Sequence, residues 1–418
     1  MTRLEVSEPI GTQPAVAASL GAGDRPRWIQ VLSHISSEFG GIAASVPELA
    51  RATEETGAYI CDSVAFCSSQ EIAGAAPSLR NTVRIFSPSR LRNLLDFQMR
   101  RDLYASIQSA KGIHIHGLWE THCTAGARLA RAIRRPYIVS AHGMLDAWSV
   151  RQKRFKKAFY AALIETPILK RAACLRALTS TEADDYRRIG LPNPIVVVPN
   201  GVAVPPAVTP ELFFELFPKL AEKRIALFLG RLHAKKGVDL LLEAWSGLCQ
   251  GSAGAPGNAH LVIAGPCDDA TQTRLHGLCA PLGIENSVTF TGMLAGSRKW
   301  AALAAAHAFV LPSHSEGFSV SILEALAMAL PVIISEPCHM PEVGEHGAGW
   351  VVRPEPQAVR DALAAFYACS QTEAEAMGYR GRRLAHQHYA WSVVGRQMAE
   401  VYQWLEGGPK PQSVEVLL

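Results

Sequence analysis

The stretch IALFLGRLHAKKGVDLLLEAWSGL, residues 225–248, decides the fold class. Its first five residues, Ile225–Leu229, are apolar and typical of a buried strand. A loop with Gly230 and Gly237 follows, and from Val238 the apolar residues recur at the spacing of an amphipathic helix. A strand that leads directly into a helix predicts a parallel sheet with helices on both sides.

The same alternation of strand and helix continues along most of the chain. Its length of 418 residues favours two domains, and Asn200-Gly201 marks a loop near the middle. We predict an α/β fold of two Rossmann-like, doubly wound parallel-sheet domains with a ligand-binding cleft between them. The strands are predicted at Trp28–Ser33, Ala58–Phe66, Ile113–His116, Tyr137–Ser140, Leu175–Ala177, Ile195–Val198, Ile225–Leu229, His260–Ala264, Ser287–Phe290, Ala308–Leu311 and Val332–Ser335.

Composition limits the class of protein further. Hydrophobic residues make up 48% and charged residues 19%, which argues against disorder. The sequence has no apolar run long enough for a transmembrane helix and no signal-peptide pattern at its start. Nine cysteines without a CxxC pair fit reduced thiols and a cytoplasmic location. We expect a flexible leader at 1–24, domains at 25–205 and 206–385, and a flexible tail at 408–418.

Basic residues are concentrated in the first half of the chain. Residues 1–205 have 25 Lys and Arg against 17 Asp and Glu, and many of the bases fall within 151–176. Aromatic residues are interleaved with them, so this segment fits either an anionic membrane surface or an ordinary helix face. Nucleic acid is disfavoured because no recognised reading module accompanies the patch. His114 and His116 form an HxH pattern, which we interpret as structural or pocket-lining, because no third metal ligand has a suitable spacing.

The usual phosphate-binding motifs are absent from the sequence. No GxGxxG follows a predicted strand, no GxxxxGK[ST] occurs, and no Asp-x-Asp is present to hold a metal on a diphosphate. Instead, Arg231 and Lys236 lie on the loop between Gly230 and Gly237, where both cations can reach one anion. The alternative is a basic surface loop without a ligand.

A second candidate segment is Glu316-Gly317-Phe318-Ser319 and the helix that follows it up to Glu324. Small residues let the backbone approach a ligand, and free N–H groups at a helix start bind anions. The two carboxylates suit sugar hydroxyls, although a helix cap and a solvated residue are the alternatives. Glu324 lies in an almost fully apolar stretch, where a carboxylate needs a partner.

Two weaker signals come from the first half of the chain. His142-Gly143 directly follows the predicted strand Tyr137–Ser140, so His142 is placed for the cleft or for the core behind it. Gly40-Gly41 follows the first predicted strand and allows the backbone to approach a ligand.

In this order the segments resemble glycosyltransferase family 4, also known as group 1, whose members are retaining nucleotide-sugar transferases of the GT-B fold. The resemblance spans about residues 28–400. His142 to Asp146, followed by the basic stretch 153–157, is similar to bacterial members that build surface polysaccharides. The matching segments are Gly40-Gly41, His142-Gly143, Pro199-Asn200-Gly201, Gly230-Arg231, Lys236-Gly237, Glu316 to Ala325, Pro341-Glu342 and Gly349–Val352.

The resemblance implies a role for each matching residue. Arg231 and Lys236, next to Gly230, would hold the donor diphosphate, and Gly41 with Gly40 would lie near the phosphates. Glu316 would contact the transferred sugar, and Glu324 would bind the ribose. The backbone of Gly317, Phe318 and Ser319 would seat the donor, His142 would lie beside its sugar, and a helix within 386–407 would cross back to the first domain.

Two positions depart from the family pattern. Ser319 stands where many members have a second glycine, and Lys235 precedes Lys236, so the assignment of Lys236 rests on its adjacency to Gly237.

The expected reaction is metal-independent transfer, with retention, from a UDP- or GDP-sugar to a saccharide or lipid-linked saccharide in exopolysaccharide, capsule or lipopolysaccharide synthesis. No cofactor or metal is expected, and the enzyme would be cytoplasmic, with peripheral contact at the inner face of the membrane as an open question. The alternatives are glycoside hydrolysis by Glu316 and Glu324, a nucleotide-sugar epimerase of the same fold, and a non-catalytic nucleotide-sugar-binding subunit.

Overall fold

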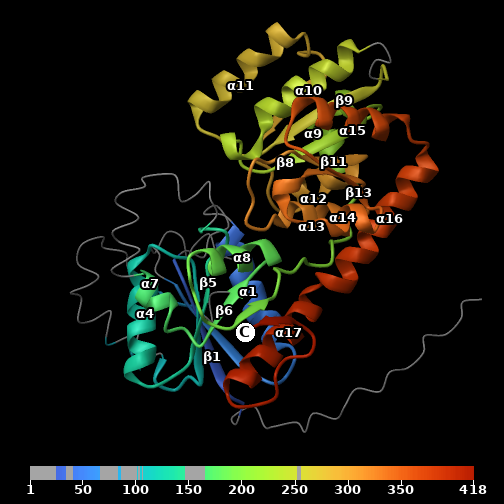
Figure 1. The fold of residues 1–418 in the computed structure, drawn as a ribbon. Helices are drawn as coiled ribbons and strands as arrows, with labels where there is room; N and C mark the ends of the chain where they lie inside the picture. Colours follow the sequence, from blue (N-terminus) through green and yellow to red (C-terminus); the bar gives the residue numbers. More distant parts are fainter. Residues whose placement is uncertain are drawn as a thin grey trace, which may run out of the picture.

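The computed structural model describes residues 25–33, 41–65, 83–85, 101, 104–105, 107–145, 165–251 and 256–418. They form two lobes, each with one β-sheet covered by helices (Figure 1). The predicted α/β fold with two Rossmann-like domains is confirmed. Each predicted strand is present in the described part of the chain, and its ends differ from the prediction by at most two residues.

The N-terminal lobe has an eight-stranded sheet in the order β14-β7-β6-β5-β4-β1-β2-β3. All neighbours are parallel except β14, which is antiparallel to β7. The strands are β1 (Arg27–Leu32), β2 (Ile60–Ala65), β3 (Val83–Ile85), β4 (Gly112–His116), β5 (Tyr137–Ser140), β6 (Cys174–Ala177), β7 (Ile195–Val197) and β14 (Glu415–Leu417). The helices described around it are α1 (Gly41–Glu54), α4 (Thr121–Ala132), α7 (Thr166–Leu169) and α8 (Ser180–Arg188).

The C-terminal lobe has a six-stranded parallel sheet in the order β10-β9-β8-β11-β12-β13. Its strands are β8 (Arg224–Leu229), β9 (Ala259–Ala264), β10 (Val288–Gly292), β11 (Ala308–Leu311), β12 (Val332–Ser335) and β13 (Gly349–Val352). Its helices are α9 (Glu211–Leu216), α10 (Val238–Gln250), α11 (Asp269–Leu282), α12 (Gly296–Ala305), α13 (Val320–Ala327), α14 (Glu342–Glu345), α15 (Pro356–Ala368) and α16 (Gln371–His388), with 3-10 turns at Pro218–Leu220, Ala234–Lys236 and Glu336–Cys338.

The strand order places the ligand-binding edge of each sheet. In the C-terminal sheet the chain winds outward from β8 to β10 and then, in the other direction, from β11 to β13. The order therefore reverses between β8 and β11, and in the N-terminal sheet it reverses between β1 and β4. Ligands of such sheets bind outside the carboxyl ends of the strands at this reversal.

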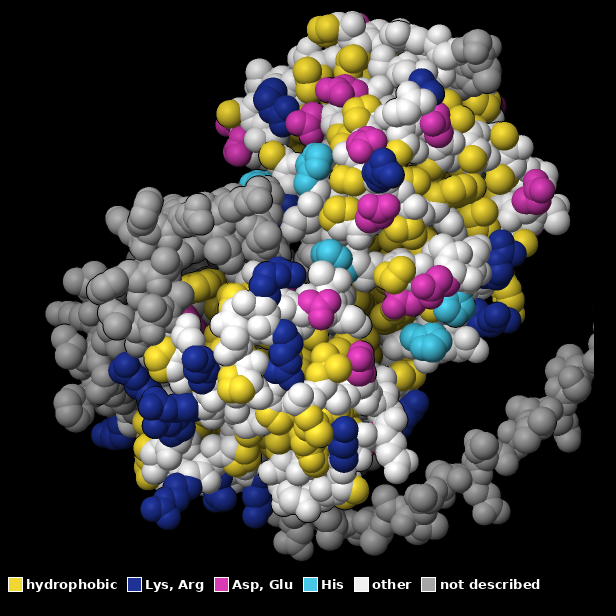
Figure 2. Space-filling model, in the orientation of Figure 1, with side chains coloured by type: hydrophobic (Ala, Val, Ile, Leu, Met, Phe, Trp, Pro, Cys, Tyr) yellow, Lys and Arg dark blue, Asp and Glu magenta, His cyan; other side chains and the backbone are white. Residues whose placement is uncertain are grey.

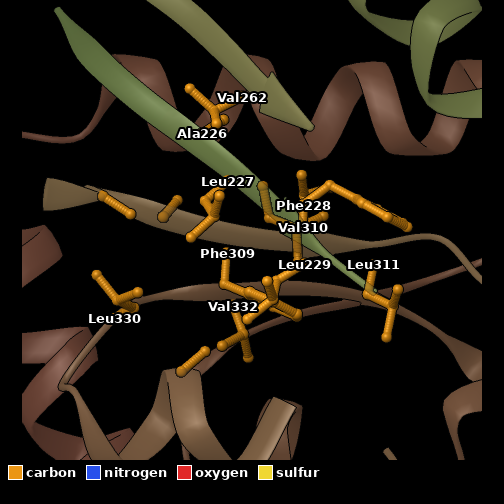
Figure 3. Close-up of a cluster of buried hydrophobic side chains, with 14 of the residues drawn as sticks. Ala226, Leu227, Phe228, Leu229, Val262, Phe309, Val310, Leu311, Leu330 and Val332 are labelled. Carbon is orange, nitrogen blue, oxygen red and sulfur yellow. The ribbon is translucent and has the colours of Figure 1, made fainter. Parts of the chain in front are cut away.

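The central strands β8 and β11 are buried on both faces, which explains their uninterrupted apolar sequences. Leu227, Phe228, Phe309 and Val310 are fully buried and pack together in the core of the C-terminal lobe (Figure 3). Burial of each such side chain contributes about 1.5–3 kcal/mol. The predicted apolar face of α10 is also confirmed, since Trp245 and its apolar neighbours on that face are buried.

A long connection returns the chain to the first lobe. Helix α16 runs down from the upper lobe, and α17 (Trp391–Leu405) lies on the lower one (Figure 1). Val394, Met398 and Tyr402 of α17 are fully buried in the core of the N-terminal lobe. A Cβ atom on Gly395 would lie 2.3 Å from the carbonyl oxygen of Ala52, so the glycine lets α17 pack closely on α1.

The prediction of a flexible tail over residues 408–418 is wrong. Leu417, Val416 and Glu415 of β14 pair with Ile195–Val197 of β7, and Val414 and Val416 pack on the core. The edge of β7 offers unpaired backbone groups, and the alternating valines provide an apolar face. The predicted leader, residues 1–24, lies outside the described residues. Within the described part of the chain, no helix has the length and apolar character needed to cross a membrane.

Candidate active site

The loops that follow β8 and β11 meet at the reversal point of the C-terminal sheet. Gly237 joins them, because its φ is 66° and a Cβ atom there would lie 2.2 Å from the carbonyl oxygen of Pro312. The backbone N–H of His314 donates to the carbonyl of Lys235 over 2.8 Å. Only glycine satisfies both the left-handed backbone and the close approach, so this position fixes how the two loops pack.

The two loops bring together one cation and one carboxylate that the sequence singled out. Lys236 Nζ lies 2.7 Å from Glu316 Oε1 and 2.9 Å from Oε2. The Ser313 hydroxyl donates to Glu316 Oε1 over 2.5 Å. The Glu316 side chain is 8% exposed and that of Lys236 is 22% exposed. The pair is therefore held away from bulk water, with one face of the lysine open.

A cavity of about 370 Å³ lies beside this pair and extends across both lobes. Its lining includes Arg231, Lys235 and Lys236 from the upper lobe and Gly41, the first residue of α1, from the lower lobe. A Cβ atom on Gly41 would meet no described residue within 4 Å, so the described part of the chain leaves room beside this glycine. Three cations and a helix start around one cavity form a site for an anion. Gly40 lies outside the described residues.

The lobes touch through backbone at two glycines. A Cβ atom on Gly143 would lie 2.5 Å from Gly317 Cα, and one on Gly317 would lie 3.0 Å from both Gly143 Cα and the carbonyl oxygen of His142. Gly143 has a φ of 74°, and its N–H donates to Glu182 Oε1 over 2.6 Å. The glycines are thus needed for the backbone contact between the two lobes. For Gly317 the sequence predicted a different role, close approach of the backbone to a ligand.

His142 lies at this contact with a left-handed backbone, φ 55°. Its Nε2 is 3.0 Å from Nδ1 of His116, and its side chain is only partly exposed. Burial lowers the pKa of His142 to about 3, and the positive charge of Arg176 adds to the effect. The imidazole is therefore neutral at physiological pH and acts through hydrogen bonds.

Glu324 has the partner that its apolar surroundings demand. Lys299 of α12 places Nζ 2.5 Å from Glu324 Oε1, and the two side chains are 26% and 12% exposed. Lys299 also lies over the ring of Trp300, 4.9 Å from its centroid. The carboxylate is thus held in place beside the first turns of α13 and is not a solvated residue.

Glu316 lies before a helix, as the sequence predicts. Helix α13 begins at Val320 with Ser319 as its N-cap residue, and Glu324 lies one turn into it. The N–H of Glu316 donates to the carbonyl of Pro337 over 3.0 Å, and its carboxylate is occupied by Lys236 and Ser313. These contacts hold it in a loop ahead of the helix, and it is not the helix cap.

Ser319 and Phe318 take positions that the family pattern left open. Ser319 has φ −91° and ψ 108°, an extended conformation that needs no glycine, and it is 4% exposed. Phe318 packs near Tyr389, with 5.9 Å between ring centroids, and lines a second cavity of about 260 Å³ together with Leu178 of the other lobe. Its side chain therefore points to this second cavity, so a donor at this segment would meet its backbone.

One glycine that packs against the β8 loop gave no signal in the sequence. Gly265, after β9, has a φ of 152°, and a Cβ atom there would lie 1.8 Å from the carbonyl oxygen of Gly230. Gly230 itself has only ordinary contacts at its Cβ position. Ser313 and Lys299 were missed as well, because only the folded chain shows that they contact Glu316 and Glu324.

The basic segment 151–176 is only partly described, since residues 151–164 lie outside the described part of the chain. Arg176, counted there among the surface bases, is fully buried and donates to the carbonyls of Val198 and Pro199. The prediction that counts Arg176 among the surface bases is therefore wrong. Its side chain supports the loop at Val198 and Pro199 from inside the protein. His114 and His116 are buried, and all four of their ring nitrogens lie within hydrogen-bond distance of another side chain.

Solved structures share this architecture. Sucrose-phosphate synthase from Thermosynechococcus elongatus superposes with a TM-score of 0.71 at 18% identity, covering 91% of this chain and 99% of that one. HepE from Anabaena, in complex with UDP-glucose, gives 0.71 at 19% identity, covering 90% and 99%. At this level of identity the likeness shows the fold. The chain thus has the GT-B fold of glycosyltransferases.

Sequence comparison gives the family. Residues 211–384 match the family of glycosyl transferases group 1, and residues 40–201 match the glycosyl transferase 4-like domain. The chain belongs to the group 1 glycosyltransferases.

Two curated relatives match at 27% identity over different shares of the chain. The GDP-mannose:cellobiosyl-diphosphopolyprenol alpha-mannosyltransferase of Xanthomonas campestris is 27% identical over 312 residues, 74% of this chain and 78% of that protein. An uncharacterized glycosyltransferase of Methanocaldococcus jannaschii is 27% identical over 187 residues, 44% of this chain and 45% of its own length. The second match therefore spans less than half of that relative.

Proposed function

We propose that the protein transfers a glycosyl group, with retention and without a metal, from a UDP- or GDP-sugar to a saccharide or lipid-linked saccharide acceptor. The single observation that carries this proposal is the cavity between the lobes. It brings Arg231 and Lys236 opposite Gly41, beside the Lys236–Glu316 pair. Cations, a helix start and an adjacent carboxylate suit a diphosphate joined to a sugar.

The leaving diphosphate would lie in the cavity of about 370 Å³. Lys236 donates to Glu316 from one side and has further N–H groups for a phosphate oxygen. Arg231 is exposed at the same cavity and presents a planar set of donors. Fixed cations stabilise the negative charge that develops on the diphosphate as the bond to the sugar breaks.

The sugar would lie between Glu316 and His142. Glu316 is held by Lys236 and Ser313, so it is a preorganised acceptor for sugar hydroxyls. His142 reaches the same place from the other lobe, because its backbone contacts Gly317. Glu324 lies one helix turn beyond Val320 and is held by Lys299. It would accept hydrogen bonds from the ribose hydroxyls.

In the proposed reaction the bond between the anomeric carbon and the phosphate oxygen breaks, and the acceptor oxygen bonds to the same face of that carbon. The acceptor proton passes to the leaving phosphate oxygen. Binding energy from the nucleoside orients the two reactants, which removes much of the entropic barrier.

Relatives support a role in surface polysaccharides. The Xanthomonas relative is named for GDP-mannose and a diphosphopolyprenol-linked acceptor, and the HepE structure contains UDP-glucose. We extend the proposal to exopolysaccharide, capsule or lipopolysaccharide assembly at the inner face of the cell membrane. Figure 2 shows Lys and Arg side chains gathered on the lower lobe, which suits peripheral contact with anionic lipid.

The alternatives account for less of the site. Hydrolysis by Glu316 and Glu324 would need one of them as a protonated acid, yet each carboxylate is paired with its own lysine. An epimerase or a non-catalytic binding subunit would bind the donor but would transfer nothing to an acceptor.

A donor screen followed by a transfer assay tests the proposal. Thermal shift across UDP- and GDP-sugars identifies the donor, because a bound ligand raises the melting temperature according to its concentration over Kd. NMR of the product with a saccharide acceptor, run with and without EDTA, should show the retained anomeric configuration at an unchanged rate. Inversion, loss of activity in EDTA, or conversion of the donor without an acceptor would contradict it.

A further inference from the structure

The HxH pattern on β4 belongs to a buried string of polar side chains that starts at the site. Its members are 0–1% exposed, apart from the terminal His142. The string runs from His142 through His116, Gln30 and Tyr402 to His114 and Ser140. Buried polar groups of this kind are costly unless each is satisfied, so a complete string in the core indicates a specific role.

The distances define one chain of hydrogen bonds. Gln30 Oε1 is 2.8 Å from His116 Nε2, and His116 Nδ1 is 3.0 Å from His142 Nε2. On the other side, Gln30 Nε2 donates to the Tyr402 hydroxyl over 2.8 Å, and that hydroxyl is 3.0 Å from His114 Nδ1.

The chemistry of the amide fixes the direction of these bonds. An amide oxygen only accepts, so His116 Nε2 carries the proton. His116 Nδ1 is then the acceptor of a neutral imidazole, and His142 Nε2 must donate to it. Burial lowers the pKa of both His114 and His116 well below the usual value, which keeps the string neutral. His142 Nδ1 is left as an acceptor, and no other described residue bonds to it.

The Tyr402 hydroxyl that accepts from this amide comes from α17, the helix that returns from the upper lobe. Tyr402 of α17 stacks on Trp28 with 3.9 Å between ring centroids and an interplanar angle of 6°. Trp28 Nε1 in turn donates to Glu406 Oε1 over 2.7 Å. These contacts hold the Tyr402 hydroxyl at Gln30 Nε2. The position of α17 is thus connected to His142 through the hydrogen bonds of Gln30 and His116.

We propose that His116, oriented by Gln30 and Tyr402, is a positioning residue for glycosyl transfer that fixes His142 as its Nε2–H tautomer. His142 Nδ1 then accepts a hydrogen bond from a hydroxyl group of the donor sugar. This inference rests on the proposed function, because it takes the sugar to lie beside His142.

The kinetic test uses a mutant cycle between His116 and His142. His116→Leu and His142→Ala should each lower kcat by about 10- to 100-fold, the range expected for a misplaced catalytic group, with an unchanged Kd for the nucleoside diphosphate. In the double variant the His116 substitution should have no further effect, because it acts only through His142. His116→Asn should keep most of the activity, since its Oδ1 replaces Nδ1 as the acceptor. Tyr402→Phe keeps the ring stack but removes the hydroxyl that Gln30 Nε2 and His114 Nδ1 contact, so it should lower both the melting temperature and kcat while the Kd for the nucleoside diphosphate stays unchanged.

The structural test is independent of turnover. Long-range ¹H–¹⁵N NMR on histidine-labelled, ligand-free protein reports which ring nitrogen carries the proton, and His142→Ala assigns the signal. A His142 signal with the proton on Nε2 supports the proposal. A proton on Nδ1, additive losses in the double variant, or a His116→Leu enzyme with wild-type kcat would overturn it. If the wild-type protein transfers no sugar from any UDP- or GDP-sugar, the proposed function fails, while the NMR result still decides the tautomer.

Discussion

Substitution of Lys236 by Met separates the structural role of the Lys236–Glu316 pair from its role in catalysis. Lys236 Nζ contacts both carboxylate oxygens, at 2.7 and 2.9 Å, and Glu316 is 8% exposed. Removing one partner of a fully buried pair costs about 3–5 kcal/mol. Because the lysine side chain is 22% exposed, water can reach the remaining charge, and we expect a loss of about 1–3 kcal/mol. Turnover should fall by about 10²-fold or more, because a cation on the leaving group is lost.

A second substitution distinguishes the two effects. Glu316→Gln in the Lys236→Met background removes the uncompensated charge and keeps an oxygen for the Ser313 hydroxyl, so stability should return to within about 1 kcal/mol of wild type. Activity should stay low. Thermal denaturation and initial rates at saturating donor measure both quantities, with Lys219→Met, an exposed lysine in the same lobe, as the control. Wild-type kcat in Lys236→Met, or recovery of activity together with stability, would refute the reasoning.

Three further predictions follow from single features of the structure. Gly143→Ala places a Cβ atom 2.5 Å from Gly317 Cα at a φ of 74°, so transfer should fall at least tenfold in rate assays, while Gly277→Ala, which has open space around it, should be silent. Burial raises the pKa of Glu165 to about 7, so the folded state binds the proton more tightly, and stability from this group falls as pH rises from about 4.5 to 7. In urea unfolding, the wild type should lose about 2–3 kcal/mol of stability from this group between pH 4.5 and pH 8, and Glu165→Gln should not show this loss. An identical pH profile of stability in both proteins would contradict the prediction. Deletion of residues 408–418 exposes the edge of β7 and should lower the melting temperature by several degrees with little change in donor KM; an unchanged melting temperature would show that β14 contributes nothing.

The strands could be predicted because buried parallel strands leave a direct signal. Phe309 and Val310 are surrounded by apolar neighbours on both faces, so their sequence is continuously apolar. The strand in the tail was missed because the alternation of Val414 and Val416 is too short to predict a strand by itself. It indicates one only when the edge of β7 is known to be available for pairing.

The candidate site residues could be selected from the sequence, but their contacts could not. Arg231 and Lys236 were selected because they follow a strand end, where parallel sheets bind ligands. That Lys236 would pair with Glu316, 80 residues away, depends on the approach of Gly237 to Pro312. Lys299 gave no signal at all, because a lysine on an amphipathic helix is ordinarily solvated. Gln30 and Tyr402 were also missed, since a polar string through a core requires the register of several strands.

A crystal structure with a bound nucleoside diphosphate tests the central claim most directly. The account predicts the diphosphate in the cavity lined by Gly41, Arg231 and Lys236, with a phosphate oxygen within hydrogen-bond distance of Lys236 Nζ and the ribose hydroxyls on Glu324. A diphosphate bound elsewhere, for example in the second cavity beside Phe318, with Lys236 still directed only at Glu316, would contradict it.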